Sequence, residues 1–91
     1  MLLEGKTFVG NRTTRVVNIE RNEPELTFSK QLENCLLDIC RALDVSPPLW
    51  MNKNTKEFAR FHQTIFTAEQ FVEDVNFHRF QITWLDDGRN K

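Results

Sequence analysis

The chain has 91 residues, of which 40% are hydrophobic and 27% are charged, and its formal net charge is −1. This length suits one domain with a single core over residues 1–91, and the composition is that of a soluble globular protein. A net charge this small argues against nucleic acid or an acidic membrane as a partner attracted by the overall field. No apolar run approaches the ~20 residues of a membrane-spanning helix, and the first residues lack the pattern of a signal peptide.

A β-hairpin is predicted at the start of the chain, with strands over residues 2–9 and 12–20. Gly10 and Asn11, which lie between the strands, tolerate the positive φ angles of a two-residue loop. Uninterrupted pairing outward from this turn places four apolar side chains on one face of the hairpin: Leu2, Phe8, Val17 and Ile19. The other face then carries Thr7, Thr14, Val16 and Asn18.

The strongest helical pattern covers residues 28–43, and Thr27 before it is a suitable N-cap. Apolar side chains recur there at helical spacing: Leu32, Cys35, Leu36, Ile39, Cys40 and Leu43. Leu37 alone is apolar on the polar side of this helix. We therefore expect Leu37 to contact a second layer of the protein or a partner.

The two cysteines, Cys35 and Cys40, lie five positions apart on this helix. That spacing separates their Cα atoms by about 8–9 Å, beyond the roughly 7 Å limit for a disulfide. Both belong to the apolar stripe, so we expect buried, reduced thiols rather than nucleophiles. Reduced thiols indicate a cytoplasmic location.

A second helix is predicted after the prolines at positions 47 and 48, and it ends at Phe61. It begins near Pro48, because proline is tolerated in a first helical turn, or only at Thr55 if the first turns are irregular. Four residues recur at helical spacing across this region: Trp50, Asn54, Phe58 and Phe61.

The remaining elements are a strand over residues 63–66, a short helix and a last strand. The segment Thr67-Ala-Glu-Gln70 has the form of a capping box, which predicts a helix of about two turns through Asp74. Alternation from Arg79 to Leu85 predicts a strand whose buried face carries Phe80, Ile82 and Trp84. Residues 86–91 form a polar tail that we expect to be frayed.

These elements predict an α+β fold. It consists of an N-terminal β-hairpin, two helices, and then strand, short helix and strand. We expect the helices to pack on one face of a small, mainly antiparallel sheet. The aromatic residues between Phe58 and Trp84 are interpreted as core, because no group of polar side chains accompanies them as in a cofactor site.

No catalytic, cofactor or metal site is predicted. His62 and His78 are far apart in the sequence, and neither has a Cys or His three or four residues away. Glu69 and Glu73 fall on one face of the predicted short helix, beside Asp74, where carboxylates commonly meet solvent. We therefore expect a protein that is not an enzyme and holds no cofactor.

Association with itself or with another protein is the first of two predicted functions. A four-stranded sheet that does not close has unpaired edges, and no proline interrupts residues 1–23 or 62–91, where the strands are placed. Three apolar side chains are also predicted outside the main core: Leu37, Val16 and Leu85. Edges and apolar side chains together favour contact with a partner.

The alternative function is nucleic-acid binding through the hairpin, which carries Lys6, Arg12 and Arg15. Thr13 and Thr14 beside them are able to contact phosphate, and a β-ribbon is able to enter a major groove. Three cations neutralise few phosphates, so the affinity would be weak and sensitive to salt. Nucleic acid is therefore the less favoured partner.

The second half of the chain also resembles a known group of proteins. The residues that carry the resemblance are Leu43–Trp50, Glu57-Phe58, Thr64-x-Phe66, Phe71–Phe77 and Arg79–Trp84. Over residues 28–85 the chain resembles short uncharacterised proteins of low-GC Gram-positive bacteria. The resemblance implies a small, stand-alone, intracellular bacterial domain, and it carries no activity, cofactor or catalytic residue over to this chain.

Overall fold

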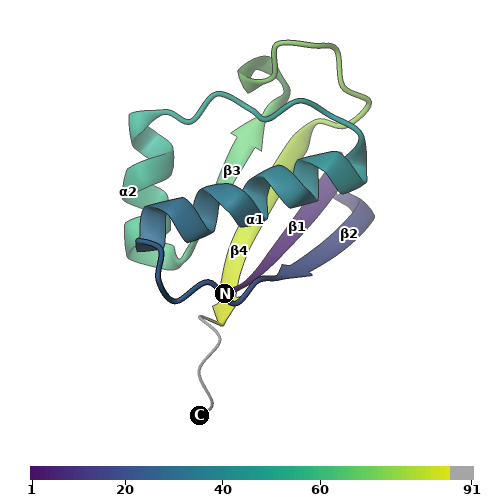
Figure 1. Cartoon of the computed structure of the whole chain (residues 1–91). Coiled ribbons are helices and arrows are strands. Elements are labelled where there is room, and N and C mark those ends of the chain that lie inside the picture. The colour runs from purple at the N-terminus through teal and green to yellow at the C-terminus, as the bar shows by residue number, and fades with distance from the viewer. Residues whose placement is uncertain (87–91) are drawn as a thin grey trace.

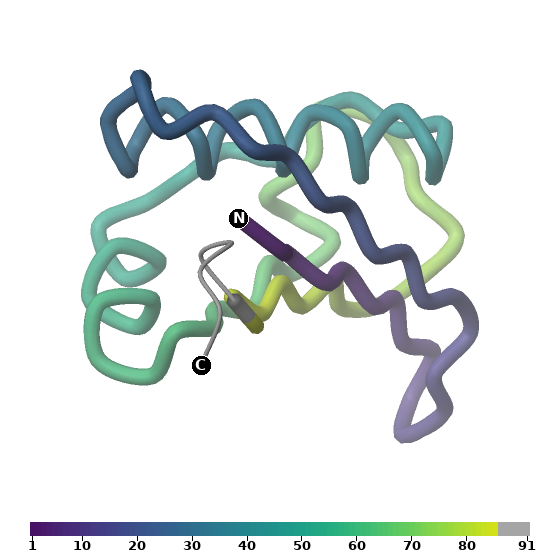
Figure 2. The backbone as a smooth tube through the Cα atoms, turned by 60° about the horizontal axis from the view of Figure 1, so that its bottom comes forward, coloured from purple at the N-terminus to yellow at the C-terminus, as the bar shows by residue number. Residues whose placement is uncertain are grey.

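The computed structural model describes residues 1–86 as one α+β domain. Two helices cover one face of a four-stranded antiparallel sheet with strand order β2-β1-β4-β3 (Figure 1). The strands are β1 (Leu2–Val9), β2 (Arg12–Glu20), β3 (Gln63–Thr67) and β4 (Arg79–Asp86), and the helices are α1 (Phe28–Leu43) and α2 (Asn52–Phe61). Within the described chain no helix covers the opposite face of the sheet (Figure 2). The predicted fold class is confirmed.

A β-bulge interrupts the hairpin close to its turn. Phe8 pairs with Thr13, whereas Thr7 pairs with Arg15, so Thr14 has no residue opposite it. The hydroxyl oxygen of Thr14 lies 2.7 Å from that of Thr7 and 3.1 Å from the Thr7 carbonyl oxygen. Side-chain hydrogen bonds therefore accompany the residue that the bulge leaves unpaired.

This bulge overturns the predicted faces of β1. A shift of one residue turns every side chain beyond it to the other face of the sheet. Val17 and Ile19 therefore share the helix-covered face with Leu3, which is fully buried. They do not share it with Leu2 and Phe8, so that prediction was wrong.

The core lies between the helices and the sheet. Thr27 caps α1 as predicted, because its hydroxyl oxygen accepts the backbone N–H of Lys30 at 3.2 Å. Cys35 and Cys40 are free and buried, as predicted. The largest fully buried apolar side chains come from the N-terminus, α1 and three strands: Met1, Leu3, Ile39, Phe66, Phe80 and Ile82.

The segment after β3 differs from the prediction. In place of a two-turn helix, a single 3-10 turn, η1 (Ala68–Gln70), is followed by extended backbone at Phe71. The backbone N–H of Thr67 still donates to the Gln70 side-chain oxygen at 3.0 Å, so half of the predicted capping box is present. The chain leaves the helical path because Phe71 is buried, with its ring edge-on to that of Phe77 at 5.3 Å.

Two predicted boundaries also change. Helix α2 begins at Asn52, between the two starts that the sequence allowed, and the side-chain oxygen of Asn54 accepts the backbone N–H of Met51 in its first turn. Asp86 belongs to β4 rather than to the tail. The rest of the predicted tail, residues 87–91, lies outside the described residues.

Candidate protein-docking groove

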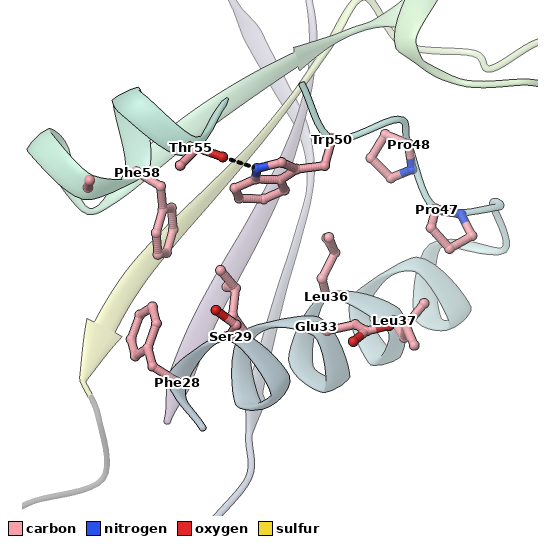
Figure 3. A pocket seen from close by; sticks show the side chains of 12 residues that line it. Phe28, Ser29, Glu33, Leu36, Leu37, Pro47, Pro48, Trp50, Thr55 and Phe58 are labelled. Atoms are coloured by element: carbon pink, nitrogen blue, oxygen red, sulfur yellow. Dashed lines mark hydrogen bonds between the residues drawn. The ribbon is translucent and has the colours of Figure 1, made fainter. Parts of the chain in front are cut away.

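A groove of about 680 Å³ lies between α1 and α2, beside the segment that joins them (Figure 3). Its lining is mostly apolar and aromatic, and α1 provides Phe28, Leu32, Leu36 and Leu37. The joining segment and α2 provide Pro47, Pro48, Trp50, Phe58 and Ala59. Three polar residues complete the lining: Ser29, Glu33 and Thr55. The volume and the apolar lining fall within the range seen for ligand pockets in proteins.

The segment that joins the helices, and that lines one side of the groove, is held in place by hydrogen bonds to Gln70 and Glu73. The backbone N–H of Leu49 donates to the Gln70 carbonyl oxygen at 2.7 Å, and the Gln70 side-chain amide donates back to the Leu49 carbonyl oxygen at 2.9 Å. The backbone N–H of Ser46 donates to the Glu73 carboxylate at 2.9 Å. These bonds fix the course of the segment between the ends of α1 and α2.

Trp50 forms a rigid aromatic wall of the groove. Its indole N–H donates to the hydroxyl oxygen of Thr55 at 2.7 Å (Figure 3). Its ring meets those of Phe58 and Phe66 edge to face, with centroids 6.1 Å and 5.6 Å apart. A hydrogen bond and two aromatic contacts therefore hold this ring in one orientation.

A buried polar cluster holds α2 on β3 behind this wall. Asn54 is fully buried, and its amide nitrogen donates to the Thr64 hydroxyl at 2.7 Å. Its amide oxygen accepts from the side chain of Gln70 at 3.0 Å. The Thr64 hydroxyl donates in turn to the Glu57 carboxylate, and this bond lowers the pKa of Glu57 below its ordinary value of 4.5. The position of Asn54 among aromatic residues at helical spacing was the only sequence signal for this cluster.

The three predicted interaction residues do not lie on one surface. Leu37 is partly buried and lines the groove. Val16 is 51% exposed on edge strand β2, where it pairs with Lys6 on the uncovered face of the sheet. Leu85 is 47% exposed at a second irregularity, where the β1–β4 pairing skips it between Trp84 and Asp86. Only Leu37 belongs to the groove.

The three cations proposed for nucleic-acid contact are divided between the faces of the sheet. Lys6 lies on the uncovered face and forms an ion pair with Glu4 at 3.6 Å. Arg15 lies on the helix-covered face, where its guanidinium donates to the carbonyl oxygen of Ala42 at 3.2 Å. Arg12 is opposite Val9 at the hairpin turn. The fold does not bring these side chains together as one basic patch.

The two histidines lie at opposite ends of the β3–β4 pair. His62 ends α2 in the left-handed conformation with φ 59°, and its ring centroid is 4.9 Å from that of Trp84. Nδ1 of His78 accepts the backbone N–H of Gly10 at 3.0 Å. Six residues of β4 separate these positions, which corresponds to about 20 Å. Within residues 1–86, no three His, Cys, Asp or Glu side chains are arranged to hold a metal ion.

The predicted cluster of carboxylates does not form a helical face. Glu69 lies in η1, but Glu73 and Asp74 follow after the helical path has ended. Hydrogen bonding by the Ser46 side chain, and then by its backbone N–H, lowers the pKa of Glu73, so this carboxylate supports the segment beside the groove. The shared face predicted for Glu69 and Glu73 was wrong.

Four large apolar side chains are exposed on the elements that form the groove. Phe28 begins α1, Leu49 and Met51 flank Trp50, and Phe61 ends α2, and all four are exposed. Phe61 was predicted in line with Phe58, which is buried, yet it is 58% exposed. Of these four, only Phe28 is itself part of the groove lining.

No family model, curated protein or solved structure matches the chain. The resemblance to proteins of Gram-positive bacteria therefore stays a prediction. Among the described helices, none combines the length and the apolar character required to cross a membrane.

Proposed function

We propose that this protein acts by protein–protein contact and that the groove between α1 and α2 is its docking surface. The single observation that carries the proposal is an apolar groove of about 680 Å³ whose walls are fixed by hydrogen bonds. Leu37, apolar on an otherwise polar side of α1, has a role in this proposal because it lines the groove. A preformed site loses less conformational entropy on binding than a flexible one.

The proposed partner presents apolar side chains on a compact element. The α1 side of the groove extends from Phe28 to Leu37. At 1.5 Å per residue this is about 14 Å, or two and a half helical turns. A groove of this length suits a short amphipathic helix or a protruding aromatic side chain.

The proposal is of a binding protein rather than an enzyme, in a reducing compartment such as the bacterial cytoplasm. Burial raises the pKa of the Cys35 thiol and raises that of Cys40 to about 11, so both thiols are poor nucleophiles. Two free thiols fit a reducing compartment. The alternative function, nucleic-acid binding, has less support because Lys6 and Arg15 lie on different faces of the sheet.

Site-specific photo-crosslinking in the native host tests the docking surface. A photoreactive phenylalanine analogue at Leu37 should give one discrete adduct with a protein. The same analogue at Val16, exposed on the other face of the sheet, is the matched control and should give none. Equal labelling from both positions, or no adduct from Leu37, contradicts the proposal.

A further inference from the structure

We infer that the occupant of the groove is a second copy of this chain, which inserts Phe61 and pairs Arg60 with Glu33. The inference rests on the docking function proposed above and names the partner for that groove. Each copy would contribute one groove and one protruding aromatic side chain, as in a two-fold dimer.

The protruding element is the end of α2. Phe61 is its last residue and is 58% exposed. The guanidinium of Arg60 lies over the Phe61 ring, 5.5 Å from its centroid. His62 then takes the left-handed conformation that ends the helix, and the chain continues into β3. Helix α2 thus presents an aromatic ring and a positive charge side by side on the surface.

The groove is complementary to this pair. Its aromatic side chains include Trp50, Phe58 and Phe28, so a phenyl ring would meet other rings. Glu33 is its one charged lining residue. In the fold Glu33 contacts only Lys30 among the described cations, at 3.4 Å and on an exposed surface. Such a pair contributes little to stability and is readily exchanged for another cation.

The positions of the two elements allow a reciprocal arrangement. Phe61 follows Phe58 by about one helical turn, and the Phe58 ring is 6.3 Å from that of Phe28 at the start of α1. The end of α2 that carries Phe61 is therefore the end nearer to Phe28, while Phe61 itself is not part of the groove lining. A two-fold axis near this end would place each Phe61 at the groove of the other copy and would form the Arg60–Glu33 pair twice.

Light scattering after size-exclusion chromatography, with wild-type protein at tens of micromolar, is the first test. The expected mass is twice that of the chain, and Phe61→Ser should reduce it to that of one chain. Val72→Ser is the matched control, because Val72 is 88% exposed and lies outside the groove lining, and this variant should remain a dimer. A wild-type monomer, or a Phe61→Ser dimer as stable as the wild type, overturns the inference.

Charge exchange is the second test, and it does not depend on how Phe61→Ser folds. Glu33→Arg and Arg60→Glu should each weaken dimerisation by about tenfold or more, and the double variant should recover to near the wild-type level. A double variant as weak as the sum of the two single changes overturns the Arg60–Glu33 pairing.

Different results would overturn the docking groove and the second copy as its occupant. A wild-type monomer whose Leu37 position still crosslinks to a different protein overturns the second copy as partner and leaves the docking groove intact. A dimer that survives Phe61→Ser, together with no adduct from Leu37, contradicts both.

Discussion

Ile39 in α1 lies so close to Gly5 in β1 that a Cβ atom at position 5 would be 2.7 Å from Cγ2 of Ile39. An edge carbon of the Phe80 ring would lie 3.0 Å from the same Cβ atom. Glycine at this position lets the helix rest directly on the strand. This close approach sets the distance between the helix layer and the sheet. It is possible only because Gly5 has no Cβ atom.

Gly5→Ala should therefore destabilise the fold by about 1–3 kcal/mol, the usual cost of overpacking a core. Urea unfolding followed by circular dichroism measures the change. In an Ile39→Ala background the same substitution should cost less, because the Cγ2 atom that it meets is gone. Equal costs in both backgrounds would show that this contact is not the cause.

The thiols of Cys35 and Cys40 should react slowly with a thiol reagent in native protein at neutral pH. Both are buried, and burial raises both pKa values, to about 11 for Cys40, so the reactive thiolate is scarce. Both should react rapidly after unfolding in denaturant. Fast labelling of both sites in the native state would contradict their placement in the core.

Stability should fall in acid, partly because of Glu57. The bond from the Thr64 hydroxyl lowers the pKa of Glu57 in the folded state below its ordinary value of 4.5. A carboxylate with a lowered pKa contributes stability above its unfolded pKa, and that stability is lost as the pH falls through the folded value. Because this group lies near solvent, we expect its contribution to be at most about 1 kcal/mol.

Glu57→Gln measures that contribution by thermal unfolding at neutral pH and below pH ~4. The variant should be less stable than the wild type at neutral pH and close to it in acid. Thr64→Val removes the donor and should flatten the pH dependence in the same way. A wild-type advantage that persists unchanged in acid would mean that the charged hydrogen bond is not its source.

Asn54→Leu should destabilise the domain strongly although the two side chains are similar in size. It leaves the Thr64 hydroxyl and the Gln70 amide without their buried partner. Each abandoned buried group costs about 1–3 kcal/mol, so we expect a loss of about 3 kcal/mol in chemical denaturation. A loss below about 1 kcal/mol would show that water replaces the missing bonds.

Wild-type protein should show no salt-sensitive binding to DNA or RNA at physiological ionic strength. Lys6 and Arg15 point to different faces of the sheet and already have partners in Glu4 and the Ala42 carbonyl. Few phosphates would be neutralised by any one face of the hairpin. A gel shift that is lost when Lys6, Arg12 and Arg15 are all changed to Ala would restore the nucleic-acid function.

The sequence predicted those elements whose signals are local. The bounds of β1, β2 and α1 agree with the prediction because a Gly-Asn turn, a threonine cap and helical spacing act within a few residues. The faces of β1 could not be predicted, since they depend on the bulge at Thr14. The helix expected after Thr67 does not continue beyond Gln70, because Phe71 is extended and packs into the core.

Only one residue of the groove lining, Leu37, could be anticipated from the sequence. Leu37 was marked as an apolar residue on a polar face, and it does line the groove. Phe61 was assigned to the buried side of α2 because helical spacing does not reveal where a helix leaves the core. The groove itself depends on the course of the segment from Pro47 to Trp50, which is set by bonds to residues more than twenty positions away.

The position of β4 in the sheet also has a consequence for synthesis. This strand is the last described element, yet it lies between β1 and β3 and is the only one that pairs with both. Until the ribosome has released residues 79–86, the hairpin and β3 have no shared partner, and pairing β1 with β4 requires closing a loop of nearly the whole chain. We therefore expect the hairpin and β3 to remain separate in the nascent chain. The four-stranded sheet should form only after β4 has emerged.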